Sequence, residues 1–164
     1  MIRPERLYDL PSIHTVHSTS FPTDAEAQLV DSLRAGRRLA VSLVAEADGL
    51  VVGHVAFSPV TVASGAVGAG LAPLAVVEAQ RRRGVGAGLV SAGLQSCREA
   101  GFGWVVVLGD PAYYARFGFK PASDFGLADE YGGDASFQVV EQVPGSLPIG
   151  GGLVQYAPEF AFLE

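Results

Sequence analysis

The stretch from Leu74 to Tyr114 constrains the possible folds more than any other part of the chain. It starts with an apolar run that ends near three consecutive arginines, and two spaced glycines then open a long helical pattern. A second apolar run, from Trp104 to Leu108, leads into a Gly-Asp-Pro turn and two tyrosines. This order of buried strand, glycine-rich turn, helix and buried strand predicts a domain that binds a phosphorylated cofactor at the turn.

Length and composition limit the class of protein. At 164 residues the chain has the length of one domain, so we expect a single domain over residues 1–164. Hydrophobic residues make up 49% and charged residues 17%, which argues against disorder, and the net charge of −6 argues against a nucleic-acid partner. The N-terminus has no apolar signal core and no stretch is suited to spanning a bilayer. We therefore expect a cytoplasmic protein without a membrane partner.

Two helices and a β-hairpin are predicted ahead of the central stretch. Ser12 and Thr23 are helix-capping residue types, and each precedes an amphipathic pattern. Asp48-Gly49 is a strong hairpin turn between two alternating runs. The expected strands cover residues 2–6, 39–47 and 50–62, and a glycine-rich loop is expected over residues 64–70.

Further strands and a short helix are predicted from the central stretch onwards. Asp110 and Pro111 suit the N-cap and first position of a helix, which Gly118 ends. The expected strands cover residues 71–77, 104–108, 136–140 and 153–156, and the expected helices cover residues 84–100 and 112–117.

The turn before the long helix has the features of an anion site. A helix N-terminus presents unpaired N–H groups and the positive end of the helix dipole, and glycines let phosphate oxygens approach the backbone. Arginine side chains nearby add charge-assisted hydrogen bonds. The expected phosphate-binding residues are Arg81, Arg82, Arg83, Gly84, Val85, Gly86 and Ala87.

Two other phosphate-binding motifs fit this turn less well. A P-loop requires a Gly-Lys-Ser/Thr ending, which the turn lacks. A dinucleotide-binding turn requires a third glycine or alanine, where this chain has Leu89. Because Asp110 follows at about the right distance for a ribose-binding acid, a dinucleotide-binding oxidoreductase stays open as an alternative.

A third type of site matches better. The pattern Arg81-x-x-Gly84-x-Gly86 after a buried strand resembles the acetyl-CoA pyrophosphate loop of the GNAT superfamily of N-acetyltransferases. The run from Leu108 to Phe119 resembles the later tyrosine and Gly-Phe motif of that superfamily, in its YhbS-like branch. The runs Gly53 to Val60 and Leu71 to Val76 are also similar to that branch. The resemblance covers essentially the whole chain.

The resemblance implies an α+β fold and a cofactor. The sheet would be mixed, mostly antiparallel, flanked by helices, and splayed between its fourth and fifth strands, with acetyl-CoA as co-substrate in the gap. Backbone groups of the fourth strand would pair with the pantetheine arm, and the Val76 N–H would polarise the thioester carbonyl. The implied cofactor-binding residues are Leu74, Ala75, Val76, Arg81, Arg82, Arg83, Gly84, Val85, Gly86, Ala87, Asp110 and Tyr113.

Acetyl transfer to an amine needs a neutral amine, an oxyanion donor and a proton for the departing thiolate. Tyr114 matches the general-acid tyrosine of the superfamily. Helical spacing puts Tyr113 and Phe117 on one face, as plausible core residues, and leaves Tyr114 free to face the cleft. His54 is the candidate general base, since an imidazole titrates in a suitable range.

Several questions stay open at the level of sequence. The fourth strand lacks the glutamate that many relatives carry there, so a non-catalytic CoA-binding module is a second alternative. His14 and His17 lie three residues apart without further ligands nearby, and we expect no metal. The acceptor is a small-molecule or peptide amine that the sequence does not identify, and a homodimer is possible.

Overall fold

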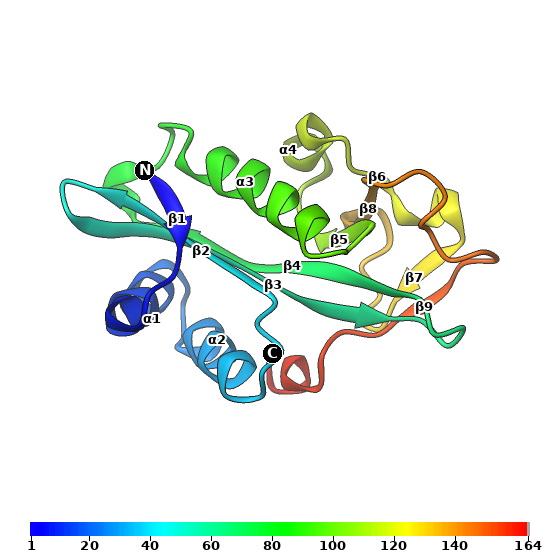
Figure 1. Ribbon diagram of the computed structural model, residues 1–164, viewed down its shortest axis with the longest axis horizontal. Coiled ribbons are helices and arrows are strands. Elements are labelled where there is room, and N and C mark those ends of the chain that lie inside the picture. Colours follow the sequence, from blue (N-terminus) through cyan, green and yellow to red (C-terminus); the bar gives the residue numbers. More distant parts are fainter. Residues whose placement is uncertain (164) are drawn as a thin grey trace.

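The computed structural model describes residues 1–163. Figure 1 shows a central sheet with α3 over one face and α1 and α2 over the other. The helices are α1 (Leu10–Ser20), α2 (Ala25–Ala35), α3 (Val85–Glu99) and α4 (Pro111–Tyr114). The strands are β1 (Ile2–Pro4), β2 (Val41–Ala47), β3 (Leu50–Thr61), β4 (Val67–Val76), β5 (Trp104–Leu108), β6 (Lys120–Pro121), β7 (Leu127–Asp129), β8 (Phe137–Glu141) and β9 (Gly152–Val154).

The main sheet is mixed and opens in its middle. Among the described residues its strand order is β1-β2-β3-β4-β5-β8-β6, and only the β4–β5 pair is parallel. Pairing between β4 and β5 covers Ala69–Leu71 and Val105–Val107 alone, whereas β4 stays paired with β3 as far as Val76. The predicted splay between the fourth and fifth strands is therefore confirmed.

Alternating side chains of β5 build two separate cores. Val105 and Val107 belong to the cluster under α3, with Leu89 and Val90. Trp104 is buried on the opposite face, in a cluster that includes residues of α2 and the C-terminal segment. A strand covered on both faces reads as a continuous apolar run, and this explains why Trp104 to Leu108 was predictable with correct bounds.

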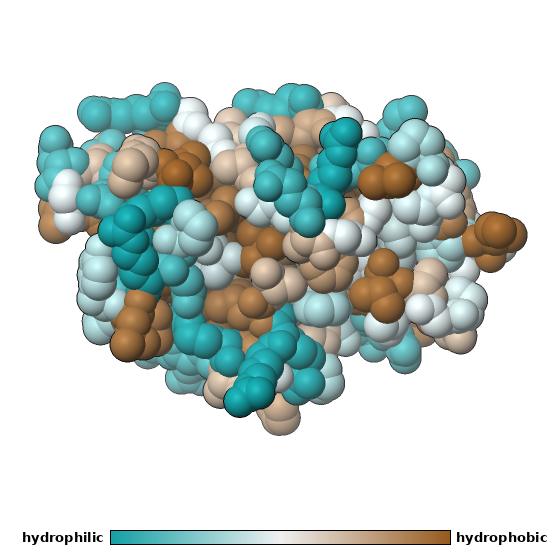
Figure 2. All heavy atoms as spheres, in the orientation of Figure 1, coloured by the Kyte–Doolittle hydropathy of each residue, from teal (hydrophilic) through white to brown (hydrophobic). Residues whose placement is uncertain are grey.

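Hydrophilic and hydrophobic side chains both reach the surface on the face drawn in Figure 2. Figure 2 shows teal hydrophilic side chains around this face, with brown hydrophobic groups visible in recesses and as separate protrusions between them. No helix among residues 1–163 is both long and apolar enough to cross a membrane.

Strand β4 starts earlier than the sequence indicates, because two glycines of the expected loop are packing residues. A Cβ added at Gly68 would lie 2.5 Å from the Trp104 ring, and one at Gly70 would lie 2.9 Å from the Tyr156 ring. The predicted loop over residues 64–70 is thus wrong from Val67 onwards. These glycines give room for aromatic rings that come from distant parts of the chain.

Other boundaries also differ from the sequence-based expectation. Helix α1 begins at Leu10, since Asp9 and not Ser12 occupies the N-cap position. The short strands β6 and β7 had not been predicted, because two- and three-residue strands carry too little alternation to be recognised. Strand β9 pairs with β7 in a separate two-stranded sheet rather than joining the main one.

Candidate functional site

A cavity of about 460 Å³ lies beside the open edge of β4. It is enclosed by the end of β4, the arginine loop, the first turn of α3 and α4. Its lining residues are Leu74, Ala75, Val76, Gln80, Arg81, Arg82, Gly84, Val85, Gly86, Ala87, Tyr113 and Arg116. The structure therefore brings most of the predicted cofactor-binding residues together around one space.

The β4 edge offers unpaired backbone groups to this cavity. The Val77 N–H donates to the Val52 carbonyl on β3 at 2.9 Å. Because backbone groups alternate in direction along a strand, the N–H groups of Val76 and Leu74 point to the other edge. Among the described residues, no β5 residue pairs with β4 beyond Leu71, so this edge is free to bind an extended ligand.

The loop that follows β4 forms a tight turn into α3. Arg82 and Gly84 both adopt left-handed backbone conformations, with φ of 64° and 80°. The Arg81 Nε donates to the Val76 carbonyl at 2.8 Å, which ties the loop to the strand end. Helix α3 then starts at Val85, and the N–H groups of its first turn have no partner within the helix. Guanidinium groups and helix N–H groups thus face the same cavity.

Tyr113 and Arg116 form the wall opposite the loop. The Tyr113 hydroxyl lies 3.1 Å from the position that a Cβ on Gly86 would occupy, so Gly86 leaves room for it. The Arg116 guanidinium lies over the Tyr113 ring, 4.5 Å from its centre. Arg116 was not predicted as a site residue, although it belongs to the motif that runs from Leu108 to Phe119. The sequence does carry a signal for Arg116: it follows Tyr113 by three residues, and this spacing brings the two side chains together on one turn of a helix.

The expected exposure of the two tyrosines is wrong. Tyr114, predicted to face the cleft, is only 9% exposed, whereas Tyr113 is half-buried and lines the cavity. The Tyr114 ring packs against Phe119 and lies 2.5 Å from the position that a Cβ on Gly109 would take. Burial raises the pKa of Tyr114 to about 12. Tyr113 and Phe117 do lie together, with ring centres 5.6 Å apart, as helical spacing predicts. Both are only partly buried against the core cluster, whereas Tyr114 is a buried member of it.

Two predicted cofactor-binding residues lie outside the cavity lining. All three arginines are exposed, but Arg83 is not among the lining residues, whereas its neighbours Arg81 and Arg82 are. The Asp110 carboxylate accepts the Ala112 N–H at 3.0 Å and so serves as the N-cap of α4. The N-cap prediction for Asp110 is confirmed.

His54 occupies a different environment from the one expected of a general base. Its side chain is fully buried, and both ring nitrogens are hydrogen-bonded: Nδ1 to His17 Nε2 at 2.8 Å and Nε2 to Ser42 Oγ at 2.7 Å. Burial holds its pKa well below the ordinary value. His54 is not among the residues that line the cavity. The predicted role as general base therefore finds no support in this geometry.

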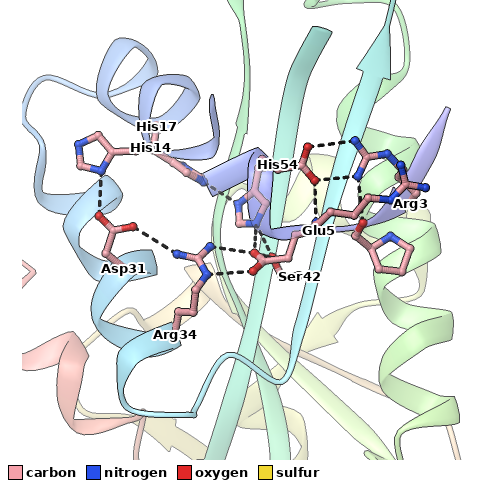
Figure 3. A network of polar contacts seen from close by, with 11 residues as sticks. Arg3, Glu5, His14, His17, Asp31, Arg34, Ser42 and His54 are labelled. Atoms are coloured by element: carbon pink, nitrogen blue, oxygen red, sulfur yellow. Dashed lines mark hydrogen bonds and ion pairs between the residues drawn. The ribbon is translucent and has the colours of Figure 1, made fainter. Parts of the chain in front are cut away.

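The two histidines belong to a larger polar network on the side of α1 and α2 (Figure 3). His17 is also fully buried, and burial lowers its pKa to about 4. From Ser42 the network continues to the Glu5 carboxylate, which the Arg34 guanidinium contacts through Nε at 2.9 Å and through Nη2 at 2.8 Å. Burial raises the pKa of Glu5, whereas the hydrogen bonds from Arg34 and Ser42 lower it. The net effect is a pKa below the ordinary value.

Metal chemistry has no visible basis in this site. Within residues 1–163 there is no group of three or more histidine, cysteine, aspartate or glutamate side chains arranged to hold an ion. A parallel sheet of the dinucleotide-binding type is also absent from the described part, because β4–β5 is the one parallel pair of the main sheet. The open edge, the arginine loop and the helix N-terminus define a site for an extended phosphorylated ligand.

The chain is similar to known proteins over nearly its whole length. The family description "Acetyltransferase (GNAT) family" matches residues 7–119. The uncharacterised N-acetyltransferase YhbS of Escherichia coli (strain K12) is 44% identical over 163 residues, which cover 98% of each chain. A crystal structure of Escherichia coli YhbS in complex with CoA superimposes with a TM-score of 0.94 at 42% identity, over 100% of this chain and 93% of that one.

A second solved structure supports the comparison. The GNAT family acetyltransferase of Brucella melitensis, in complex with acetyl-CoA, superimposes with a TM-score of 0.82 at 38% identity. The match covers 98% of this chain and 97% of that chain.

Proposed function

Since the chain belongs to the acetyltransferase (GNAT) family, we propose that its cavity holds acetyl-CoA and that it transfers the acetyl group to an amine by direct attack. The observation that carries this proposal is the junction of a free strand edge, two arginines and a helix N-terminus around one cavity. The bound CoA and acetyl-CoA in the two similar structures support the assignment of the ligand.

The cofactor would lie along β4 and end at α3. The amide groups of the pantetheine arm would pair with Leu74 and Val76, whose free N–H groups face the open edge. The pyrophosphate would bind at the first turn of α3, where Arg82 and the N–H groups of residues 85–87 converge. Arg81 contributes charge and stabilises the loop through its bond to the Val76 carbonyl.

The reaction moves one acetyl group and two protons. The amine nitrogen attacks the thioester carbon, the carbon–sulfur bond breaks, the thiolate takes up a proton and the amine gives one up. The free Val76 N–H is the candidate donor to the developing oxyanion. Tyr114, which matches the general-acid tyrosine of the family, is the candidate proton donor to the thiolate, although it is not itself among the residues that line the cavity. Its phenol is protonated at neutral pH.

No acidic side chain lines the cavity in the described part of the chain. We therefore propose that the amine loses its proton to water and not to a side-chain base. His54 would be structural, since both of its ring nitrogens are hydrogen-bonded inside the protein.

Titration calorimetry with CoA and a thiol-release assay with acetyl-CoA and amines test this function. We expect CoA to bind, and Tyr114→Phe to lower kcat by about a hundredfold while leaving CoA affinity within about twofold. Tyr8→Phe is a matched control, since Tyr8 is 68% exposed and lies in the N-terminal segment. Absence of CoA binding would overturn the proposal.

The missing acid also keeps a second function in consideration, that of a CoA-binding module without transferase activity. The same assays separate the two functions. Tight CoA binding without thiol release for any amine would favour the module. Thiol release that Tyr114→Phe abolishes would exclude it.

The cellular setting completes the proposal. We place the enzyme in the cytoplasm, with no nucleic-acid or membrane partner, in agreement with the net charge of −6. Sedimentation of the purified protein at several concentrations tests whether it forms a homodimer.

A further inference from the structure

A second cavity, of about 340 Å³, lies at the end of β5 where β4 and β5 separate. It begins directly beyond the last paired residues of the two strands, Leu71 and Val107. Most of its lining is apolar or aromatic. The lining residues are Leu71, Ala72, Leu108, Tyr131, Tyr156, Phe160 and Leu163.

The two cavities meet the same short part of β4. The first cavity starts at Leu74 and the second ends at Ala72. Between them the β3–β4 register shifts, because Val55 pairs with Leu74 but Phe57 pairs with Leu71. Such a bulge turns successive side chains and backbone groups in different directions. A donor in the first cavity and an acceptor in the second would therefore approach β4 at neighbouring residues.

Tyr156 provides a polar atom without a partner in this apolar wall. Its hydroxyl is buried and makes no hydrogen bond with any described residue. The ring is held in place by Gly70, as described for β4, and by Phe160, whose ring centre is 5.1 Å away. Its backbone N–H donates to the Glu130 carboxylate at 2.8 Å. A buried unpaired hydroxyl costs stability, so a ligand group that bonded to it would gain that energy.

The charges around this second cavity favour a cation. None of its described lining residues is basic, and Asp129 and Glu130 flank the two tyrosines. Burial first, then these carboxylates, raise the pKa of Tyr131. Aromatic faces and nearby carboxylates attract an ammonium group, whereas an anionic acceptor would find no partner.

We propose that the second cavity receives the acceptor and that this acceptor is a primary amine carried on an apolar, preferably aromatic, body. The apolar body packs against Leu108 and the aromatic rings. The neutral amine donates one N–H to the Tyr156 hydroxyl, which leaves its lone pair free to attack the thioester carbon. The inference rests on the proposed acetyl transfer and specifies its substrate class.

A series of amines tests the substrate class. Thiol release is measured with ethylamine, butylamine, hexylamine and 2-phenylethylamine, and with spermidine and a lysine-containing peptide for comparison. We expect kcat/KM to rise roughly fourfold for each methylene group buried, and to be highest for the long or aromatic amines. Equal or higher values for spermidine or the peptide would overturn the inference.

Leu108→Lys tests the location. Leu108 is 36% exposed, so a lysine is tolerated there, and its charge would repel an ammonium group. We expect at least a tenfold loss of kcat/KM for 2-phenylethylamine, with unchanged CoA affinity. The matched control is Leu50→Lys, because Leu50 is an exposed residue at the tip of the β2–β3 hairpin. An equal loss in both variants would contradict the proposed location.

Tyr156→Phe tests the hydroxyl. The ring stays, so packing is retained, and we expect KM for the amine to rise by roughly fivefold with little change in CoA affinity. Tyr8→Phe is the control, since Tyr8 is 68% exposed, is not among the residues that line the cavity, and its change should alter KM less than twofold. An unchanged KM in Tyr156→Phe would exclude the hydroxyl as an acceptor ligand.

A binding measurement keeps the inference testable without turnover. Saturation-transfer NMR is recorded for 2-phenylethylamine with the CoA-loaded protein. Saturation transfer to the ring protons of the amine should be seen with the unmodified protein and lost in Leu108→Lys. That result would support binding in the second cavity even if the chain were no transferase. Absence of transfer together with thiol release from a hydrophilic amine would reject the cavity and keep the proposed function.

Discussion

The three adjacent arginines of the loop have different environments, although their sequence context is nearly the same. Arg82 lines the first cavity and Arg83 does not, although both side chains are exposed. We expect Arg82→Ala to weaken CoA binding by roughly tenfold or more, the size of a lost charge-assisted hydrogen bond. Arg83→Ala is the matched control and should change affinity less than twofold. Titration calorimetry at low and high salt measures both, and equal losses would contradict the assignment.

Gly109 controls the position of the Tyr114 ring. A methyl group at residue 109 would overlap the ring, because the Cβ position lies 2.5 Å from one of its carbons. We expect Gly109→Ala to displace the ring and to lower kcat by roughly tenfold or more, with CoA affinity retained.

A double-mutant cycle checks that this effect acts through the phenol. In a Tyr114→Phe background, Gly109→Ala should cost little further kcat, since the proposed proton donor is already absent. Losses that multiply in the double variant would show that Gly109 acts on some other part of the site.

At the scale of the element, α3 shows two glycines whose roles differ. A Cβ at Gly93 would lie 2.2 Å from the buried Phe57 ring, whereas one at Gly88 would meet only the terminal methyl of Ile2, at 2.9 Å. We expect Gly93→Ala to destabilise the protein by about 1–3 kcal/mol, because the ring cannot move. Gly88→Ala should be neutral or stabilising by up to about 1 kcal/mol, since alanine favours the helix. Urea denaturation measures both, and equal effects would refute the packing argument.

Elements were predictable where residues close in sequence determine them. Helix α3 and strand β5 follow from periodicity, capping and apolar runs, and their predicted bounds agree with the structure within one residue. The start of β4 was missed because Gly68 and Gly70 were read as loop residues. In the structure they pack against Trp104 and Tyr156, and such long-range contacts leave no local pattern.

At the scale of the whole molecule, the polar network joins the N-terminal segment, both helices of one face and two strands (Figure 3). His17 and His54 are buried and neutral within it, and their pKa values lie below that of an unfolded histidine. At a pH between the pKa of a histidine in the folded protein and its pKa in the unfolded chain, the unfolded chain binds more protons. The free energy of unfolding should therefore fall as the pH decreases below about 6.5.

The pH dependence of stability checks this prediction. His17 alone would account for a loss on the order of 3 kcal/mol if the pH reached its folded pKa of about 4. Urea denaturation is measured between pH 7.5 and 5. This interval lies above the pH range in which Glu5 and Asp9 titrate, because their pKa values are lowered. We expect His54→Gln to flatten the dependence. An unchanged slope in His54→Gln would contradict the prediction.

The sequence by itself determined the family, the strand–turn–helix–strand order and most of the residues that line the first cavity. These depend on consecutive residues, such as Arg81 to Ala87, whose backbone and side chains form the site locally. Only the tertiary structure decided which tyrosine lines the cavity, that His54 is enclosed by His17 and Ser42, and that Ala72, Leu108 and Tyr156 share a second cavity. These features depend on contacts between segments far apart in the chain, which the local pattern of residues does not encode.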